Sequence, residues 1–158
     1  AFDNKIPTNA KLQIKFEVDT DTVKNFEIET RYVLAPTSFP VISLKKPDLF
    51  AGKVHALLFR KWKNRIKGRD FYDYVWYLKN EIPLSLKYLS NKAVQFGHIQ
   101  IGDLETVEQL KKMILERVKS INFENAKDDI RPFIKDQREI DIWSRDFFSQ
   151  ITESIKIV

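Results

Sequence analysis

One short stretch of the chain combines many basic side chains with no acidic one, and two carboxylates follow it directly. Residues 60–69 read RKWKNRIKGR, and Asp70 and Asp73 come next. A dense run of cations attracts phosphate groups. A carboxylate beside such a run can hold Mg²⁺ or orient a hydroxyl group during phosphoryl transfer. The stretch therefore predicts a phosphate-handling site, and a solvated connection between two helices is the plainer alternative. The basic residues of the stretch are Arg60, Lys61, Lys63, Arg65, Lys67 and Arg69.

The two carboxylates are three residues apart, which places them on one flank of a helix. Asp70 stands where we expect the N-cap of that helix, so capping alone can explain it. Lys53 is the second candidate. At helical spacing it falls between Leu49 and Leu57, inside the apolar arc of the helix that follows Pro47. Its ammonium group either reaches solvent past the apolar side chains or points into a cleft, where it suits phosphate oxygens.

A third set of candidates lies on the first predicted strand. Lys15, Glu17 and Asp19 share one face of it, which is either solvated surface or the side of a site that brings a carboxylate near a metal. The string DTD at residues 19–21 is typical of a turn rather than of a metal site. His55 and His98 are isolated in the sequence, and we interpret both as structural.

The elements that must position these side chains follow an α+β order. Alternation of apolar and polar residues predicts strands over 11–19 and 26–34, paired as a hairpin, and FPVISL predicts a third strand. Helical spacing predicts about five helices afterwards. We expect a single domain over 1–158, with a small sheet in 1–46 and a helical portion in 47–158. The predicted helices begin after Pro47 and near Asp70, and then cover roughly 85–96, 103–119 and 139–155.

Composition limits the classes of function. The chain has a net charge of +5, but residues outside 60–69 sum to −1, so the excess is local and points to an anionic partner at one place. No apolar run is long enough to span a membrane, and the absence of cysteine fits a reducing cytoplasm. Because the chain begins at Ala1 and its one methionine is Met113, we expect it to be the later portion of a longer protein.

Four strings, in this order, resemble the AbiEii-type nucleotidyltransferase toxins, which are abortive-infection proteins of phage defence that are paired with an antitoxin. They are LQIKFEVD, KKPDLFAGKVHALLFRKW, KGRDFYDYVWYL and DDIRPFIKDQREIDIWSRDFF. The resemblance spans nearly the whole chain, and its most specific part is the lysine of LFAGKVHAL followed by RDFYD. It implies the later portion of a polymerase-β-like fold, with Mg²⁺ as cofactor and a nucleoside triphosphate as substrate.

By position, the resemblance implies that Lys15 and Glu17 belong to a charged motif beside the active cleft. It implies that Lys53 meets nucleotide phosphates and that Asp70 is needed for transfer. Glu17 and Asp70 are then the candidate metal ligands. Together with the charge pattern, this makes Arg69, Asp73, Arg60 and Lys63 further substrate-binding candidates.

The chain departs from the family at its first motif, a glycine pair with Ser or Thr followed by Asp-x-Asp, which nothing in the sequence matches. One remaining carboxylate cannot position two metal ions, so we expect this polypeptide alone to be inactive. Three hypotheses follow. The chain is part of an enzyme that transfers a nucleotidyl group to an acceptor such as a tRNA end, or it is a non-catalytic domain that binds RNA or an antitoxin through residues 60–69. The third and plainest is a degenerate helper domain whose charged residues only keep it in solution.

Overall fold

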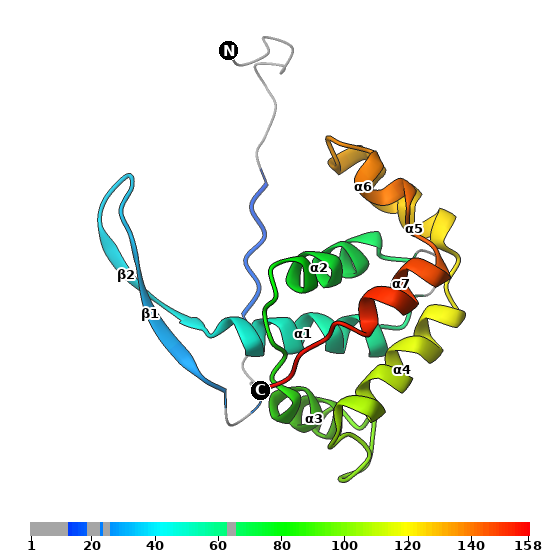
Figure 1. The fold of residues 1–158 in the computed structure, drawn as a ribbon. Helices are drawn as coiled ribbons and strands as arrows, with labels where there is room; N and C mark the ends of the chain where they lie inside the picture. Colours follow the sequence, from blue (N-terminus) through cyan, green and yellow to red (C-terminus); the bar gives the residue numbers. More distant parts are fainter. Residues whose placement is uncertain (1–12, 19–22, 24–25, 63–65) are drawn as a thin grey trace.

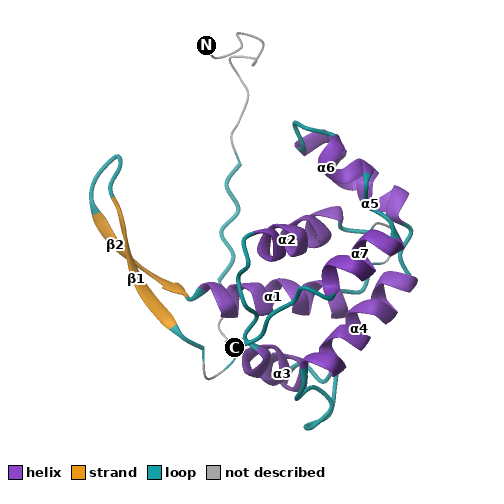
Figure 2. Ribbon diagram, viewed as in Figure 1, coloured by secondary structure: helices purple, strands orange, loops and turns teal. Residues whose placement is uncertain are grey.

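The computed structural model describes residues 13–18, 23, 26–62 and 66–158. Within them a two-stranded sheet precedes a body of helices, which confirms the predicted α+β class. Figure 1 shows the hairpin of β1 and β2 extending away from the helices, and Figure 2 shows that no helix covers it. The predicted boundary at residue 46 stays a prediction, and the first helix begins at that position.

The sheet contains two of the three predicted strands, those over 26–34 and in FPVISL, and it pairs them with each other. β1 (Ile28–Val33) runs antiparallel to β2 (Phe39–Leu44), with Ile28 opposite Leu44 and Val33 opposite Phe39. The described part of the first predicted strand, residues 13–18, has no strand assignment. Its apolar side chains Ile14, Phe16 and Val18 are 67%, 88% and 84% exposed. The prediction of a strand there, paired with 26–34, is wrong, because alternation of apolar and polar residues does not by itself supply a surface that covers the apolar side chains. Lys11 and Asp19, the ends of the predicted strand, lie outside the described residues.

Polar contacts join the hairpin to the first helix, α1 (Lys46–Phe59). The buried carboxylate of Asp48 accepts a hydrogen bond from the Glu27 backbone N–H at 2.6 Å. Lys45 donates its own N–H to the Glu27 carbonyl at 2.8 Å, and its ammonium pairs with the Glu27 carboxylate at 2.7 Å. The strand that leads into α1 is therefore held at its base, although the sheet itself buries little.

The helices begin at residues suited to that place. Pro47 occupies the first turn of α1, and Ser85 caps α3. Thr106 and Gln109 form a capping box, which explains why α4 starts later than the predicted residue 103. The helices after α1 are α2 (Gly68–Lys79), α3 (Leu86–Gln95), α4 (Val107–Lys119), α5 (Phe123–Ile130), the 3₁₀ turn η1 (Arg131–Phe133), α6 (Arg138–Asp141) and α7 (Arg145–Thr152).

Two helix predictions need correction. The predicted helix over 139–155 is divided into α6 and α7, because the Ser144 hydroxyl accepts the Phe147 N–H and starts a new helix. The helix α5 was not predicted. Its N-cap is Asn122, whose side chain accepts two backbone N–H groups, so the signal was present in the sequence.

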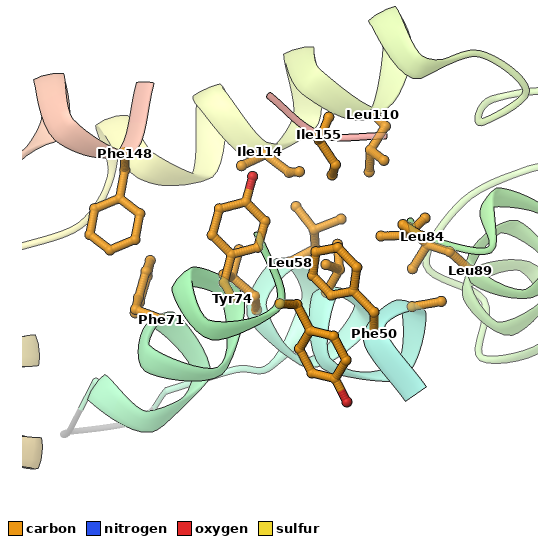
Figure 3. Close-up of a cluster of buried hydrophobic side chains, with 14 of the residues drawn as sticks. Phe50, Leu58, Phe71, Tyr74, Leu84, Leu89, Leu110, Ile114, Phe148 and Ile155 are labelled. Atoms are coloured by element: carbon orange, nitrogen blue, oxygen red, sulfur yellow. The ribbon is translucent and has the colours of Figure 1, made fainter. Parts of the chain in front are cut away.

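The core lies where α1 packs against α2, α3 and α4, with α5 against α2 and α7 against α4. Figure 3 shows the buried side chains gathered between these helices, with Phe71 and Phe148 at one end and Leu84 and Leu89 at the other. Phe71 meets Phe148 edge-on, with ring centroids 5.3 Å apart. The Tyr74 hydroxyl lies 3.0 Å from the Thr152 hydroxyl, so the one polar group of this tyrosine has a partner in the core.

Candidate functional site

The candidate site is built on two packed helices, α1 and α2. Lys53 lies on α1, and its ammonium nitrogen is 2.8 Å from Oδ2 of Asp73 on α2. The buried face of α1 is rotated from the predicted one, because Asp48 is buried and Leu49 is exposed. Lys53 consequently stands at the edge of the core, about half exposed, with its charge held by a carboxylate.

Asp70 and Arg60 form the second pair across these elements. Arg60 follows the last residue of α1, and its Nε is 3.2 Å from Oδ2 of Asp70. Asp70 is not the N-cap that the sequence predicted, since α2 begins at Gly68 and Lys67 precedes it. The helix starts earlier because the Gly68 N–H donates to the Asp129 carboxylate of α5 at 2.9 Å. Asp70 therefore lies inside the first turn, with its side chain turned inward.

The surroundings of Asp70 set its electrostatics. The residue is only 3% exposed, and this burial raises the pKa of its carboxyl group. Arg60, Arg69 and Lys53 oppose that rise through their positive charges, while Asp73 adds to it. Oδ2 of Asp70 is buried and meets Arg60 without hydrogen-bond geometry. Asp70 is thus a buried carboxyl group whose ionised form is disfavoured by burial and favoured by the nearby cations.

Arg117 of α4 completes this cationic environment, and the sequence analysis did not single it out. Its guanidinium donates to the Leu57 carbonyl at 3.1 Å and to the Arg60 carbonyl at 2.8 Å, which caps the end of α1. It also lies over the Trp62 ring, 4.0 Å from the centroid. Burial lowers the pKa of Arg117, and Asp70 opposes this. The signal in the sequence for this residue was its position one helical turn after the apolar Ile114, which the structure buries.

The remaining predicted site residues lie in several different parts of the chain, and the structure does not gather those that it describes around one site. Lys15 and Glu17 pair with each other on the exposed segment 13–18, and no described contact joins them to α1 or α2. Lys63 lies outside the described residues. Arg69 is exposed at the start of α2. The structure thus joins Lys53 to Asp73 and Arg60 to Asp70, but not Lys15 or Glu17 to either pair.

The two histidines are close in space although they are distant in sequence. The rings of His55 on α1 and His98 are 5.2 Å apart, and Phe59 stacks on His98 with centroids 4.6 Å apart. Burial is the main reason why the pKa of His55 falls to about 4, and the nearby charges of Lys92 and His98 lower it further. Nε2 of His55 is buried without a hydrogen-bond partner in the described structure. The two residues are isolated in the sequence but adjacent in the fold, and their structural role stays a prediction.

The described residues do not fit a metal centre by themselves. No three His, Asp or Glu side chains gather as a metal group in the parts of the chain that the structure describes. Asp70 faces arginines rather than a second carboxylate, and Glu17 is paired with Lys15. A divalent ion requires several oxygen ligands, so Glu17 and Asp70 alone do not complete such a site, and their role as metal ligands stays a prediction.

Comparison with known proteins identifies the family of the chain. The chain matches the family model described as "Nucleotidyl transferase AbiEii toxin, Type IV TA system" over residues 2–150. The chain therefore belongs to the AbiEii nucleotidyl transferase toxin family, a family of type IV toxin–antitoxin systems. No curated protein and no solved structure gives a significant match. No helix in the described ranges is long and apolar enough to cross a membrane.

Proposed function

We propose that this chain supplies the phosphate-contacting part of an enzyme that transfers a nucleotidyl group from a nucleoside triphosphate to an RNA end such as that of a tRNA. In such a reaction an acceptor hydroxyl attacks the α-phosphorus, and pyrophosphate leaves with added negative charge. The observation that supports the proposal is the pair of cations, Lys53 and Arg60, that α1 holds against carboxylates of α2 in a chain of this family.

Lys53 is the proposed catalytic residue. Its ammonium is half exposed and already fixed by Asp73, so a triphosphate can replace that carboxylate without a large loss of side-chain freedom. Cations placed in advance where charge develops stabilise the transition state. In this proposal Asp73 keeps the lysine oriented when no nucleotide is bound.

Asp70 is the proposed positioning residue for Arg60. With only 4% of its side chain exposed, its carboxylate reaches the arginine rather than an acceptor hydroxyl. Arg60 is additionally held in place because its carbonyl accepts a hydrogen bond from Arg117. Arg60 and Arg69 then contact the triphosphate, while the roles of Lys15, Glu17 and Lys63 stay predictions from the resemblance.

We infer that the Mg²⁺ ligands and the rest of the cleft come from the family's first motif, which this sequence does not contain. The chain alone is then inactive, and an extended polypeptide with that motif ahead of residue 1 is active. The family's type IV toxin–antitoxin assignment makes a cognate antitoxin the further expected partner.

Nucleotide incorporation into RNA by the extended polypeptide tests this function. We expect Lys53→Ala to lower kcat by about a hundredfold, the effect of removing one preorganised group that stabilises charge in the transition state. Asp70→Asn should lower it as well, while Lys87→Ala, which removes an exposed lysine of α3, should not. Full turnover in both Lys53→Ala and Asp70→Asn would contradict the assignment.

A second candidate is a non-catalytic domain that binds RNA or an antitoxin through residues 60–69. It is supported by Lys61, Lys67 and Arg69, which make no ion pair with a described residue. RNA binding of this kind weakens steeply as salt rises, with a slope that reflects the number of phosphates contacted. Replacing Lys61, Lys67 and Arg69 by alanine should flatten that slope, and an unchanged slope would remove this candidate.

A further inference from the structure

A pocket beside the start of α2 lies apart from the Lys53–Asp73 pair. Its volume is about 520 Å³, within the range of roughly 300–1,000 Å³ that is typical of small-molecule sites. Its lining residues come from the first turn of α2, the end of α5 and the turn η1 with Ile134 after it, and α2 and α5 pack against each other. Its lining residues are Lys67, Arg69, Tyr72, Asp129, Ile130, Phe133 and Ile134.

The lining has a charged end and an apolar end. Lys67 and Arg69 flank Gly68, and neither forms an ion pair with a residue that the structure describes. The third charged group, Asp129, has its carboxylate engaged by the Gly68 N–H at 2.9 Å. The two cations are therefore available to an anion, whereas the helix N–H of Gly68 is already satisfied.

The apolar end presents aromatic surface to a ligand. Phe133 is 78% exposed, which is unusual for a phenylalanine and leaves one side of its ring uncovered. Tyr72 also lines the pocket, and its hydroxyl donates to the Glu139 carboxylate at 3.0 Å, which fixes the ring. Ile130 and Ile134 complete the apolar surface. A planar ring can stack there, because every nucleobase offers a π-face to an aromatic side chain.

We propose that this pocket binds a nucleoside phosphate, with the phosphate at Lys67 and Arg69 and the base against Phe133 and Tyr72. The combination of two free cations with an uncovered aromatic ring favours this ligand over an acidic peptide, which would use the cations but not the ring. Arg69 takes part in the proposed transfer reaction as well, but Lys67, Tyr72 and Phe133 have no role in that reaction, so the two proposals can be tested separately.

The nucleoside phosphate can come from a free nucleotide or from an unpaired end of RNA. A second pocket of about 360 Å³ shares Tyr72 and continues along α2 past Trp76 and Lys79. Trp76 is four residues after Tyr72, so both rings face the same side of the helix. This continuation gives a second nucleotide of a strand an aromatic ring and a cation to contact.

Titration of the chain with AMP and with a single-stranded RNA hexamer tests the proposal. We expect at least one of them to bind, and Arg69→Ala and Phe133→Ala each to weaken that binding by tenfold or more. Binding of AMP identifies a free-nucleotide site, and binding of the hexamer alone, weakened further by Trp76→Ala, identifies an RNA-end site. A failure of this proposal is distinguished from a failure of the proposed transferase function by two variants: Phe133→Ala should weaken probe binding, and Lys53→Ala should lower nucleotide incorporation.

Matched controls identify the contribution of the aromatic ring. Tyr32→Ala removes a similarly exposed aromatic side chain from β1, and Lys87→Ala removes an exposed cation from α3; neither should alter affinity. Far-ultraviolet circular dichroism confirms that each variant is folded. The proposal is overturned if neither probe binds, if Phe133→Ala binds as well as the wild type, or if an oligoglutamate peptide displaces the probe at equal concentration.

Discussion

Gly68 is the position where the contact between α2 and α5 is most sensitive to a single added carbon atom. A Cβ built on Gly68 would lie 2.0 Å from the carbonyl oxygen of Ala126, 3.1 Å from the carbonyl carbon of Ala126 and 3.1 Å from Cβ of Ile130. The first of these atoms belongs to the backbone of α5, so a side-chain rotation cannot relieve the overlap. Gly68→Ala therefore requires the two helices to separate.

The expected cost follows from three contributions. Overpacking of a filled interior typically costs about 1–3 kcal/mol. Separation of the helices also weakens the 2.9 Å hydrogen bond from Gly68 to Asp129, which is worth about 1 kcal/mol. The higher helix propensity of alanine returns at most about 1 kcal/mol. We expect a net loss of about 2 kcal/mol in the free energy of unfolding.

Gly52→Ala is the matched control, because it makes the same chemical change inside α1. Nothing lies within 4 Å of a Cβ at Gly52, so only the helix propensity changes. We expect this variant to gain about 0.8–1 kcal/mol. Urea denaturation, monitored by circular dichroism, gives the free energy of unfolding of both variants by linear extrapolation. If Gly68→Ala were as stable as the wild type while Gly52→Ala was stabilised, the described packing of α2 on α5 would be refuted.

Two further predictions concern the buried polar groups. Tyr74→Phe should cost about 1 kcal/mol in the free energy of unfolding, because it removes one buried hydrogen bond while Thr152 keeps its bond to the Phe148 carbonyl at 2.7 Å; a change below 0.3 kcal/mol in urea melts would contradict it. His55 has a folded-state pKa of about 4 against an ordinary value of 6.5, so the unfolded chain takes up its proton first, and stability should fall as pH decreases from 6.5 to 4. His55→Phe should lose less stability than the wild type between pH 7 and pH 4.5, and equal losses in urea midpoints would rule out this role.

Sequence reasoning predicted the elements whose signals are local. The change from alternating to helical spacing after Pro47 identified the α+β order, and Ser85 marked the start of α3 within one residue. The motif strings also predicted the family, and the family model confirms that prediction. These signals are local because capping and helical periodicity depend on residues within one or two turns.

Tertiary contacts decided what the local signals could not. The pattern at residues 13–18 is that of a strand, but no surface covers it, so β1 pairs with β2 instead. Asp70 carries the local signal of an N-cap, but α2 begins at Gly68 because that residue contacts α5. His55 and His98 are brought together by packing between α1 and the end of α3.

The sequence by itself determined which charged residues lie between positions 60 and 73 and which family the chain belongs to. Only the fold decided their partners: Asp73 holds Lys53, and the buried Asp70 holds Arg60. The physical reason is that burial and pairing depend on which helix faces which. Those faces are fixed by contacts between residues distant in the chain, such as Gly68 with Ala126 and Arg117 with Leu57.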